Sequence, residues 1–170
     1  MDTIMKQPDE LHREEIGSFW GWLGVGLFFV TAVVMFALFY VQRACGPLGD
    51  NPMPDWLYPV IAVFFLAIGF IVANFIRLTI SLTPQGITAS YGCFRHFEPW
   101  DNIAEVERDD SFYGGWGIRA GYKNGGRVLI YNVMGAPVLS LKLTSGRRKY
   151  FGFSTKHPDE VSLLIKNWKR

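Results

Sequence analysis

Histidine and cysteine often carry metal or nucleophilic chemistry, and this chain has five of them. The histidines are His12, His96 and His157, and the cysteines are Cys45 and Cys93. None of them has a Cys, His or carboxylate at a spacing that would make a convincing metal site. We therefore expect surface or structural histidines, two unpaired cysteines, and no bound metal or cofactor.

The carboxylates and hydroxyls likewise do not form a catalytic set. No Ser/His/Asp combination, nucleophile elbow or carboxylate pair in a pocket can be recognised in the sequence. Asp109 and Asp110 are adjacent, and adjacent side chains on a strand point to opposite faces. We therefore expect that the protein is not an enzyme.

A glycine-rich stretch, DDSFYGGWGIR, lies in the second half of the chain. It lacks the Gly-Lys-Ser/Thr ending of a phosphate loop, and no helix follows it. One interpretation is a flexible loop between strands. The other is a contact loop, because exposed aromatic residues are typical anchors of protein interfaces. The residues expected to make that protein contact are Phe112, Tyr113, Trp116 and Arg119.

The densest basic run is Arg147-Arg148-Lys149. If it lies on a strand, Arg147 and Lys149 share one face. One interpretation is a solvated hairpin tip. The alternative is contact with an acidic partner or with lipid headgroups, which is worth about 1 kcal/mol per basic residue near an anionic membrane.

Two long uncharged runs in the first half of the chain predict membrane helices, which would anchor the candidate contact residues at a membrane. No Asp, Glu, Lys or Arg occurs from Ile16 to Gln42 or from Trp56 to Ile76. About 20 apolar residues span a bilayer as a helix, so both runs are long enough. We expect a transmembrane hairpin over 16–77, with helices at about 19–41 and 57–76 and a short loop over 44–56.

Aromatic residues mark the ends of both expected helices, where amphipathic rings favour the headgroup level. These expected interface anchors are Trp20, Trp22, Tyr40, Trp56 and Tyr58. The connection between the helices holds one basic residue, Arg43, whereas the N-terminal and C-terminal sides hold more. The distribution predicts that both termini are cytoplasmic, in a two-pass protein of the bacterial inner membrane.

Small residues recur at a spacing of four in the helical region. Gly17 and Gly21 form one pair, and Gly69 and Ala73 form another. Such spacing lets helix backbones approach closely. One interpretation is that the two helices pack on each other, and the other is a contact with a second membrane protein.

Charge is distributed unevenly along the chain. Residues 1–80 hold four Lys/Arg against seven Asp/Glu, a net −3, and residues 81–170 hold thirteen against eight, a net +5. Residues 1–15 form a polar, acidic segment that we expect as a short surface helix or a tail. A modestly basic domain beside a membrane suits an anionic leaflet or an acidic partner. No nucleic-acid motif accompanies this charge, so we expect no nucleic-acid partner.

The pattern changes after Leu78, where short apolar and polar runs alternate with turn signals such as Asn124-Gly125-Gly126. This predicts about seven short antiparallel strands over 78–170. A C-terminal helix is expected at about 158–168, because Pro158 suits a first turn and the following acids favour the positive end of its dipole. Its apolar stripe consists of Val161, Leu164, Ile165 and Trp168.

Three stretches of residues 78–170 resemble the bacterial pleckstrin-homology-like (bPH) domain of membrane proteins with uncharacterised function. The stretches are LTISLTPQGITASYG, FEPWDNIAEVE and VLSLKLTSGRRKYFGFSTKHPDEVSLLI. The resemblance implies a small β-barrel closed by the C-terminal helix and preceded by membrane helices. It does not imply phosphoinositide binding, because the first hairpin, SLTPQGITAS, has no Lys or Arg.

Together these patterns predict a membrane-anchored α+β protein. Its expected function is that of a non-catalytic accessory or assembly subunit of a bacterial inner-membrane protein complex, possible examples including photosynthetic complexes. Its expected partners are membrane lipid and another integral membrane protein. The alternative is a binder or sensor of anionic lipid at the membrane surface, through Arg147, Arg148 and Lys149.

Overall fold

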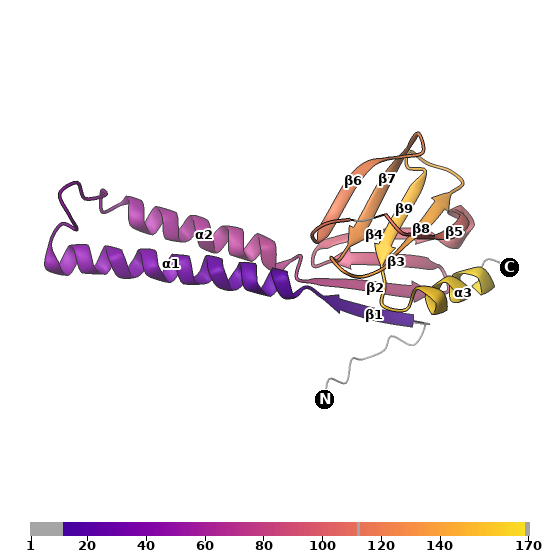
Figure 1. Cartoon of the computed structure of the whole chain (residues 1–170), viewed down its shortest axis with the longest axis horizontal. Coiled ribbons are helices and arrows are strands. Elements are labelled where there is room, and N and C mark those ends of the chain that lie inside the picture. The colour runs from indigo at the N-terminus through magenta and orange to yellow at the C-terminus, as the bar shows by residue number, and fades with distance from the viewer. Residues whose placement is uncertain (1–11, 112, 169–170) are drawn as a thin grey trace, which may run out of the picture. The chain divides into compact units, whose positions relative to one another are not determined.

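The computed structural model describes residues 12–111 and 113–168, and the chain forms two compact units (Figure 1). One unit is a helical hairpin over Phe19–Ile76. The other is a β-domain that combines the segment before the hairpin, up to Ser18, with the chain from Arg77 onward. Each unit is described by itself.

The hairpin consists of α1 (Phe19–Cys45) and α2 (Leu57–Ala73). Helix α1 extends past the expected end near residue 41 and stops at Gly46, whose φ of 95° suits the left-handed position after a helix. Within the described residues, α1 is the one helix long and apolar enough to cross a membrane; α2 has 17 residues and is shorter. At 1.5 Å per residue, α2 rises only about 26 Å.

Helix α2 ends three residues earlier than the uncharged run predicts. The backbone N–H groups of Asn74, Phe75 and Ile76 donate to carbonyls three residues back rather than four, at 2.9 to 3.4 Å. The Asn74 side-chain amide donates to the Phe70 carbonyl at 3.0 Å. The α-helix therefore tightens into a final turn of 3-10 type, which carries the chain to Ile76.

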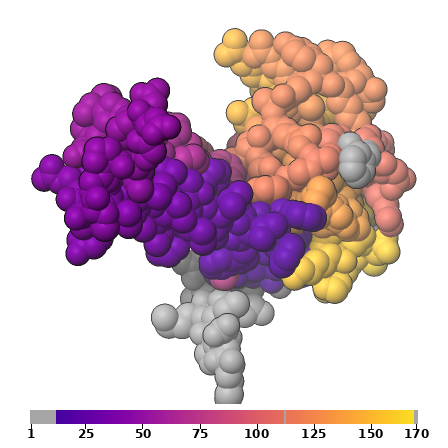
Figure 2. Space-filling view, turned by 60° about the vertical axis from the view of Figure 1, so that its left-hand side comes forward, coloured from indigo at the N-terminus to yellow at the C-terminus, as the bar shows by residue number. Residues whose placement is uncertain are grey.

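The two helices pack closely at Gly69 of α2, which has no side chain. A methyl group placed on Gly69 would lie 3.3 Å from Phe28 Cβ, and the rings of Phe28 and Phe65 stack 6.0 Å apart. Many other apolar side chains of both helices are exposed, including Phe29 and Phe70. Figure 2 shows one face of this helical unit. Such a surface requires an apolar environment.

A polar cluster joins the two helices at the loop end of the hairpin. Gln42 donates to Asp55 Oδ1 at 2.6 Å and to the Met53 carbonyl at 2.8 Å, and the Tyr58 hydroxyl donates to Gln42 at 3.0 Å. Tyr58 is thereby only 5% exposed. The expectation that Tyr58 anchors the membrane interface is wrong, because its ring and hydroxyl pack inside the hairpin.

The β-domain contains two sheets rather than the closed barrel expected from the sequence. Among the described residues it has nine strands instead of about seven. They are β1 (His12–Gly17), β2 (Arg77–Thr83), β3 (Gly86–Tyr91), β4 (Phe94–Pro99), β5 (Ile103–Asp109), β6 (Gly117–Lys123), β7 (Gly126–Asn132), β8 (Val138–Leu143) and β9 (Tyr150–Ser154).

The first sheet has the order β1-β2-β3-β4, and the second has the order β5-β8-β9-β7-β6. A short 3-10 helix, η1 (Trp100–Asn102), carries the chain from one sheet to the other. The pairing of β7 with β9 is parallel, so the expectation of a purely antiparallel set is also wrong. Figure 1 shows the sheets as two layers, with the C-terminal helix at one end.

Strand β1 corrects the expectation for the N-terminal segment. The structure places His12–Gly17 in a strand, antiparallel to β2, whereas a surface helix or tail was expected; residues 1–11 lie outside the described residues. Alternation buries Glu14 and Ile16. Glu14 is satisfied by Thr155 Oγ1 at 2.6 Å and the Lys156 backbone N–H at 2.5 Å. Gly17 therefore belongs to a strand and cannot contribute to helix packing.

The expected C-terminal helix is confirmed as α3 (Pro158–Trp168), which packs against β5 and β8. Val161 and Ile165 are fully buried, Leu164 is half-buried, and Trp168 is exposed. The inner half of the predicted stripe thus joins the core. The largest core side chains include Tyr91, Phe151, Phe153, Leu78, Ile80 and Leu141.

Candidate ligand-binding cleft

A cleft of about 590 Å³ opens in the described part of the β-domain. Strand β4 and η1 line it from the first sheet. The second sheet contributes strands β6, β7 and β8 and the loop between β8 and β9. The apolar lining includes Ala120, Val128 and Leu143. Its size is in the range of small-molecule sites.

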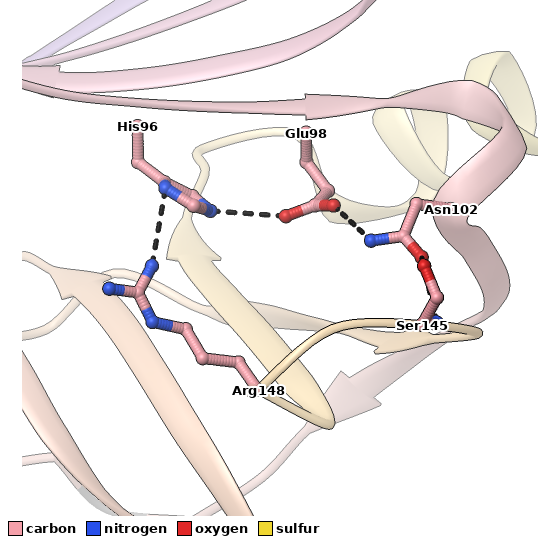
Figure 3. Close-up of polar contacts among 5 residues, drawn as sticks. All are labelled: His96, Glu98, Asn102, Ser145 and Arg148. Atoms are coloured by element: carbon pink, nitrogen blue, oxygen red, sulfur yellow. Dashed lines mark hydrogen bonds and ion pairs between the residues drawn. The ribbon is translucent and has the colours of Figure 1, made fainter.

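A continuous chain of polar contacts runs along one side of this cleft (Figure 3). Arg148 Nη1 lies 3.3 Å from His96 Nδ1, and His96 Nε2 lies 3.1 Å from Glu98 Oε2. The other Glu98 oxygen, Oε1, accepts a hydrogen bond from the Asn102 amide at 2.5 Å. Strand alternation explains part of the chain, because His96 and Glu98 are two residues apart on β4 and share one face.

His96 is neutral at the middle of this chain. Burial lowers its pKa below the usual 6.5, outweighing the opposing effect of Glu98, and the nearby Arg148 lowers the pKa further. A single tautomer then satisfies both contacts: Nε2–H donates to Glu98, and the Nδ1 lone pair accepts from the Arg148 guanidinium. The ring packs edge-on against Phe151, with centroids 4.6 Å apart.

The same chain fixes the loop over residues 144–149. Asn102 Oδ1 accepts hydrogen bonds from the Ser145 backbone N–H at 2.8 Å, the Ser145 hydroxyl at 2.7 Å and the Thr144 hydroxyl at 2.9 Å. Buried Glu98 therefore connects, through Asn102, to the start of the loop and, through His96, to the guanidinium that the loop carries. The contacts hold the start of the loop at Thr144 and Ser145, and they hold the side-chain head of Arg148.

The lining of the cleft is positive. It includes Arg127, Arg147 and Arg148 against one carboxylate, Glu98, for a formal charge of +2. Both oxygens of Glu98 already accept hydrogen bonds, whereas each guanidinium carries five N–H donors. The free hydrogen-bonding capacity of the cleft is therefore cationic and donor-rich, which suits an anion.

The predicted basic run supplies two of these arginines and lies at the tip of the β8–β9 hairpin, which is one of its two expected interpretations. Arg147, Arg148 and Lys149 are exposed residues of an irregular segment between β8 and β9. Lys149 lies over Gly126, where a methyl group would come within 2.6 Å of its Cβ and Cδ atoms. Its stem therefore packs on the β6–β7 turn, while Arg147 and Arg148 line the cleft.

The predicted contact loop lies elsewhere and is held from inside. Tyr113 and Trp116 are half-buried rather than exposed, Arg119 is exposed on β6, and Phe112 lies outside the described residues. The Tyr113 hydroxyl donates to Asp109 at 2.8 Å. The fully buried Asn132 donates to the carbonyls of Tyr113 and Gly115 at 3.3 and 2.9 Å. Internal hydrogen bonds thus hold the glycine-rich segment in place.

Asp109 is the centre of this second polar cluster. It accepts hydrogen bonds from Lys123 Nζ at 2.6 Å and from the Ser111 backbone N–H at 3.1 Å, in addition to Tyr113. Burial alone would raise its pKa, but the hydrogen bonds from Lys123, Ser111 and Tyr113 outweigh burial and lower the pKa to about 2. The carboxylate is therefore ionised and fully paired.

The remaining expected positions lie in the helical hairpin. Trp20, Trp22, Tyr40 and Trp56 are exposed, as interface anchors would be. Gly21 is buried within the hairpin, Gly69 contacts Phe28, and Ala73 is exposed at the end of α2. Cys45 and Cys93 are exposed free thiols, and the described residues contain no group of three His, Cys, Asp or Glu that could hold a metal ion.

Sequence reasoning missed the residues that organise the cleft. His96 was expected to be a surface or structural histidine, and no role was expected for Glu98 or Asn102. The spacing in FRHFEPWDN places His96 and Glu98 on one face, which was a usable signal. The contact with Arg148, 52 residues further along the chain, has no local signature.

Comparison with known proteins adds no family to this description. No protein-family model, curated protein or solved structure matches the chain. The fold and the cleft therefore define the class of protein: an α+β chain with a long apolar helix and a β-domain of two sheets.

Proposed function

We propose that this chain is a non-catalytic, membrane-anchored binding protein that recognises an anionic group at the membrane surface. The hairpin crosses the bacterial inner membrane twice, with both termini in the cytoplasm, and the β-domain is a variant of the pleckstrin-homology-like plan. The outward apolar side chains of α1 and α2 support the membrane location. For α2, the uncharged run continues to Ile76, which adds the length that the α-helix alone lacks.

One observation carries the binding role: the polar groups of the cleft satisfy one another and leave arginines in excess. His96 uses both ring nitrogens, Glu98 uses both oxygens, and the Ser145 hydroxyl donates to Asn102. This arrangement favours recognition over proton transfer or nucleophilic attack. Restraining Arg148 in advance lowers the entropy lost when an anion binds.

Chain connectivity keeps the β-domain beside the bilayer. Only Ser18 separates β1 from α1, and only residues 74–76 separate α2 from β2. Short connections of this kind hold the domain at a high effective concentration near the headgroups.

The test is a calorimetric titration of the purified full-length chain, in neutral detergent, with short-chain anionic and zwitterionic lipids. We expect binding of the anionic lipid alone, weakened by salt. The Arg147→Ala/Arg148→Ala variant should bind about tenfold more weakly or worse, because it loses two charge-assisted partners. A matched control, Arg95→Ala/Arg108→Ala, removes the same charge at exposed positions outside the cleft. Equal loss in both variants would reject the cleft as the site.

A second candidate function is that of an accessory or assembly subunit of a larger inner-membrane complex. Phe94 and Phe97 favour it, because both are nearly half exposed on β4, the last strand of its sheet. Exposed aromatic residues are typical of interface anchors. A gentle-detergent pull-down from the native membrane should recover a stoichiometric partner with wild type and lose it in Phe94→Ser/Phe97→Ser. Recovery of the chain alone would reject this candidate.

A further inference from the structure

Resting on the proposed function, we propose that the cleft binds a lipid whose headgroup ends in a phosphomonoester. In this arrangement Arg127, Arg147 and Arg148 hold the phosphate, and the apolar side of the cleft accepts the adjoining glycerol and first acyl carbons. The ligand class is thereby narrowed from any anionic group to a lipid phosphomonoester.

The charge of the cleft selects a doubly charged group. Three arginines and one glutamate leave a formal charge of +2. A phosphomonoester carries about −1.5 to −2 near neutral pH, whereas a carboxylate or a phosphodiester carries only about −1. Only the monoester comes close to neutralising the lining.

The donors of the cleft also match a terminal phosphate. One N–H of Arg148 is committed to His96, which leaves the rest of its fork available. Arg147 follows in sequence on the same loop, and Arg127 approaches from β7. A terminal phosphate offers three acceptor oxygens, so it can meet three guanidinium groups at once.

The rest of the lining favours a lipid over a sugar phosphate or a nucleotide. Ala120, Val128 and Leu143 offer no hydrogen bonds from their side chains. The Ser145 hydroxyl already donates to Asn102, and the Tyr122 hydroxyl lies 3.4 Å from Arg127 Nε. Sugar hydroxyls placed there would lose hydrogen bonds to water without replacement, whereas hydrocarbon would not. The short connections to α1 and α2 tether the β-domain that contains this site to the helical hairpin.

Glu98, His96 and Asn102 are positioning residues in this proposal, because they act through Arg148 and through the loop that carries it. Replacing His96 with Gln leaves all three arginines in place but removes the ring whose Nδ1 accepts from Arg148. We expect the variant to bind the phosphomonoester more weakly while retaining its melting temperature within a few degrees. Replacing the exposed His157 with Gln is the matched control.

The deciding experiment titrates the full-length chain in neutral detergent with four short-chain probes and measures heat and the ³¹P NMR shift of each ligand. The probes are a phosphatidic acid, a phosphatidylglycerol, a phosphatidylcholine and glycerol 3-phosphate. We expect the phosphatidic acid to bind about tenfold more tightly than the phosphatidylglycerol and glycerol 3-phosphate, with no detectable binding of phosphatidylcholine. The Arg147→Ala/Arg148→Ala variant should lose this preference, and Arg95→Ala/Arg108→Ala should keep it.

The outcomes separate this inference from the function on which it rests. Equal affinity for phosphatidic acid and phosphatidylglycerol would overturn the phosphomonoester inference and leave anionic recognition standing. Glycerol 3-phosphate binding as tightly as the phosphatidic acid would overturn the lipid source. Binding of none of the anionic probes would overturn both the inference and the proposed function. An Arg148→Lys variant that keeps the preference would overturn the role of the guanidinium fork.

Discussion

Glu98 and Asp109 are both buried carboxylates at or near strand ends in the β-domain, with exposed fractions of 6% and 8%, but their hydrogen-bond partners differ. Asp109 contacts the Lys123 ammonium directly and accepts two further hydrogen bonds. Glu98 is bonded to the neutral imidazole of His96 and to the amide of Asn102. The nearest cation in this series of contacts, Arg148, bonds to His96 rather than to Glu98 itself. At Asp109 the cation is paired directly with the carboxylate, whereas near Glu98 the Arg148 guanidinium keeps N–H donors that are available to a ligand.

The different partners of Asp109 and Glu98 imply different roles, one in stability and the other in ligand recognition. A directly paired and fully bonded carboxylate stabilises the fold, and little hydrogen-bonding capacity remains for a ligand. A carboxylate that restrains a cation through a neutral intermediary organises a binding group without neutralising it. We therefore expect changes at Asp109 to affect unfolding, and changes at Glu98 to affect ligand affinity more than unfolding.

The largest effect should come from Asp109→Ala. The change leaves the Lys123 ammonium and the Tyr113 hydroxyl without their acceptor in a half-buried site. We expect the free energy of unfolding to fall by about 3 kcal/mol. Thermal unfolding of the full chain, followed by the fluorescence of the buried Trp100 among others, measures this loss. The neighbouring Asp110→Ala, an exposed position, is the control, and an equal loss there would contradict the comparison.

The next effect concerns Glu98→Gln, which keeps the shape of the side chain but turns one acceptor into a donor. The new amide cannot accept from both His96 and Asn102, so the chain to Arg148 and the loop is broken at one point. We expect a loss of about 1 kcal/mol in stability and about tenfold in affinity for the anionic lipid. Calorimetry on the full chain tests this, with the exposed Glu105→Gln as control. Unchanged affinity would show that Arg148 needs no restraint.

A smaller effect is expected for Tyr113→Phe. This change removes one of the donors that lower the pKa of Asp109, so that pKa should rise from about 2 while the Lys123 contact remains. We expect a loss of about 1 kcal/mol in stability. A carboxylate NMR titration and an unfolding curve measure the two quantities. Tyr122→Phe, at an exposed tyrosine of β6, should change neither the pKa nor the stability.

The smallest effect is the pH dependence of His96. Its pKa in the folded chain is lowered below 6.5 by burial, so its contribution to stability is present above 6.5 and is lost as pH falls toward the lowered value. Protonation of His96 would turn the Nδ1 acceptor into a second N–H donor that faces the Arg148 guanidinium. The other neighbours of the ring are Glu98, which accepts from Nε2, and the ring of Tyr131. Imidazole NMR titration of the full chain should show His96 titrating below 6.5. Titration of His96 above 6.5 would show that Glu98 outweighs burial.

The helical elements were the most predictable part of the fold. The uncharged run after Ile16 predicts α1, and the cap, dipole and stripe signals of residues 158–168 predict α3 with its observed bounds. Both depend on neighbours within a few residues of one another. The ends of helices were less predictable, because Gly46 and the side chain of Asn74 decide them through local backbone geometry.

The candidate site was predictable only in part. The basic run and its place at a hairpin tip were recognised from the sequence. Tyr113, in contrast, was expected at the surface although its hydroxyl is held by Asp109. An exposed aromatic residue and one that reaches a buried carboxylate have the same local sequence. Asp109 lies only four residues before Tyr113, but its burial depends on the pairing of β5 with β8, which the local sequence does not specify.

The amino-acid sequence by itself determined the uncharged helices, the short strands and turns of the second half, and the amphipathic C-terminal helix, because charge, period and capping act over a few residues. Only the tertiary structure decided that β1 joins β2 across the hairpin, that β7 pairs with β9 in parallel, and that His96 meets Arg148. These contacts join residues far apart in the chain. Their geometry follows from how the two sheets bury their apolar faces together, which no local pattern specifies.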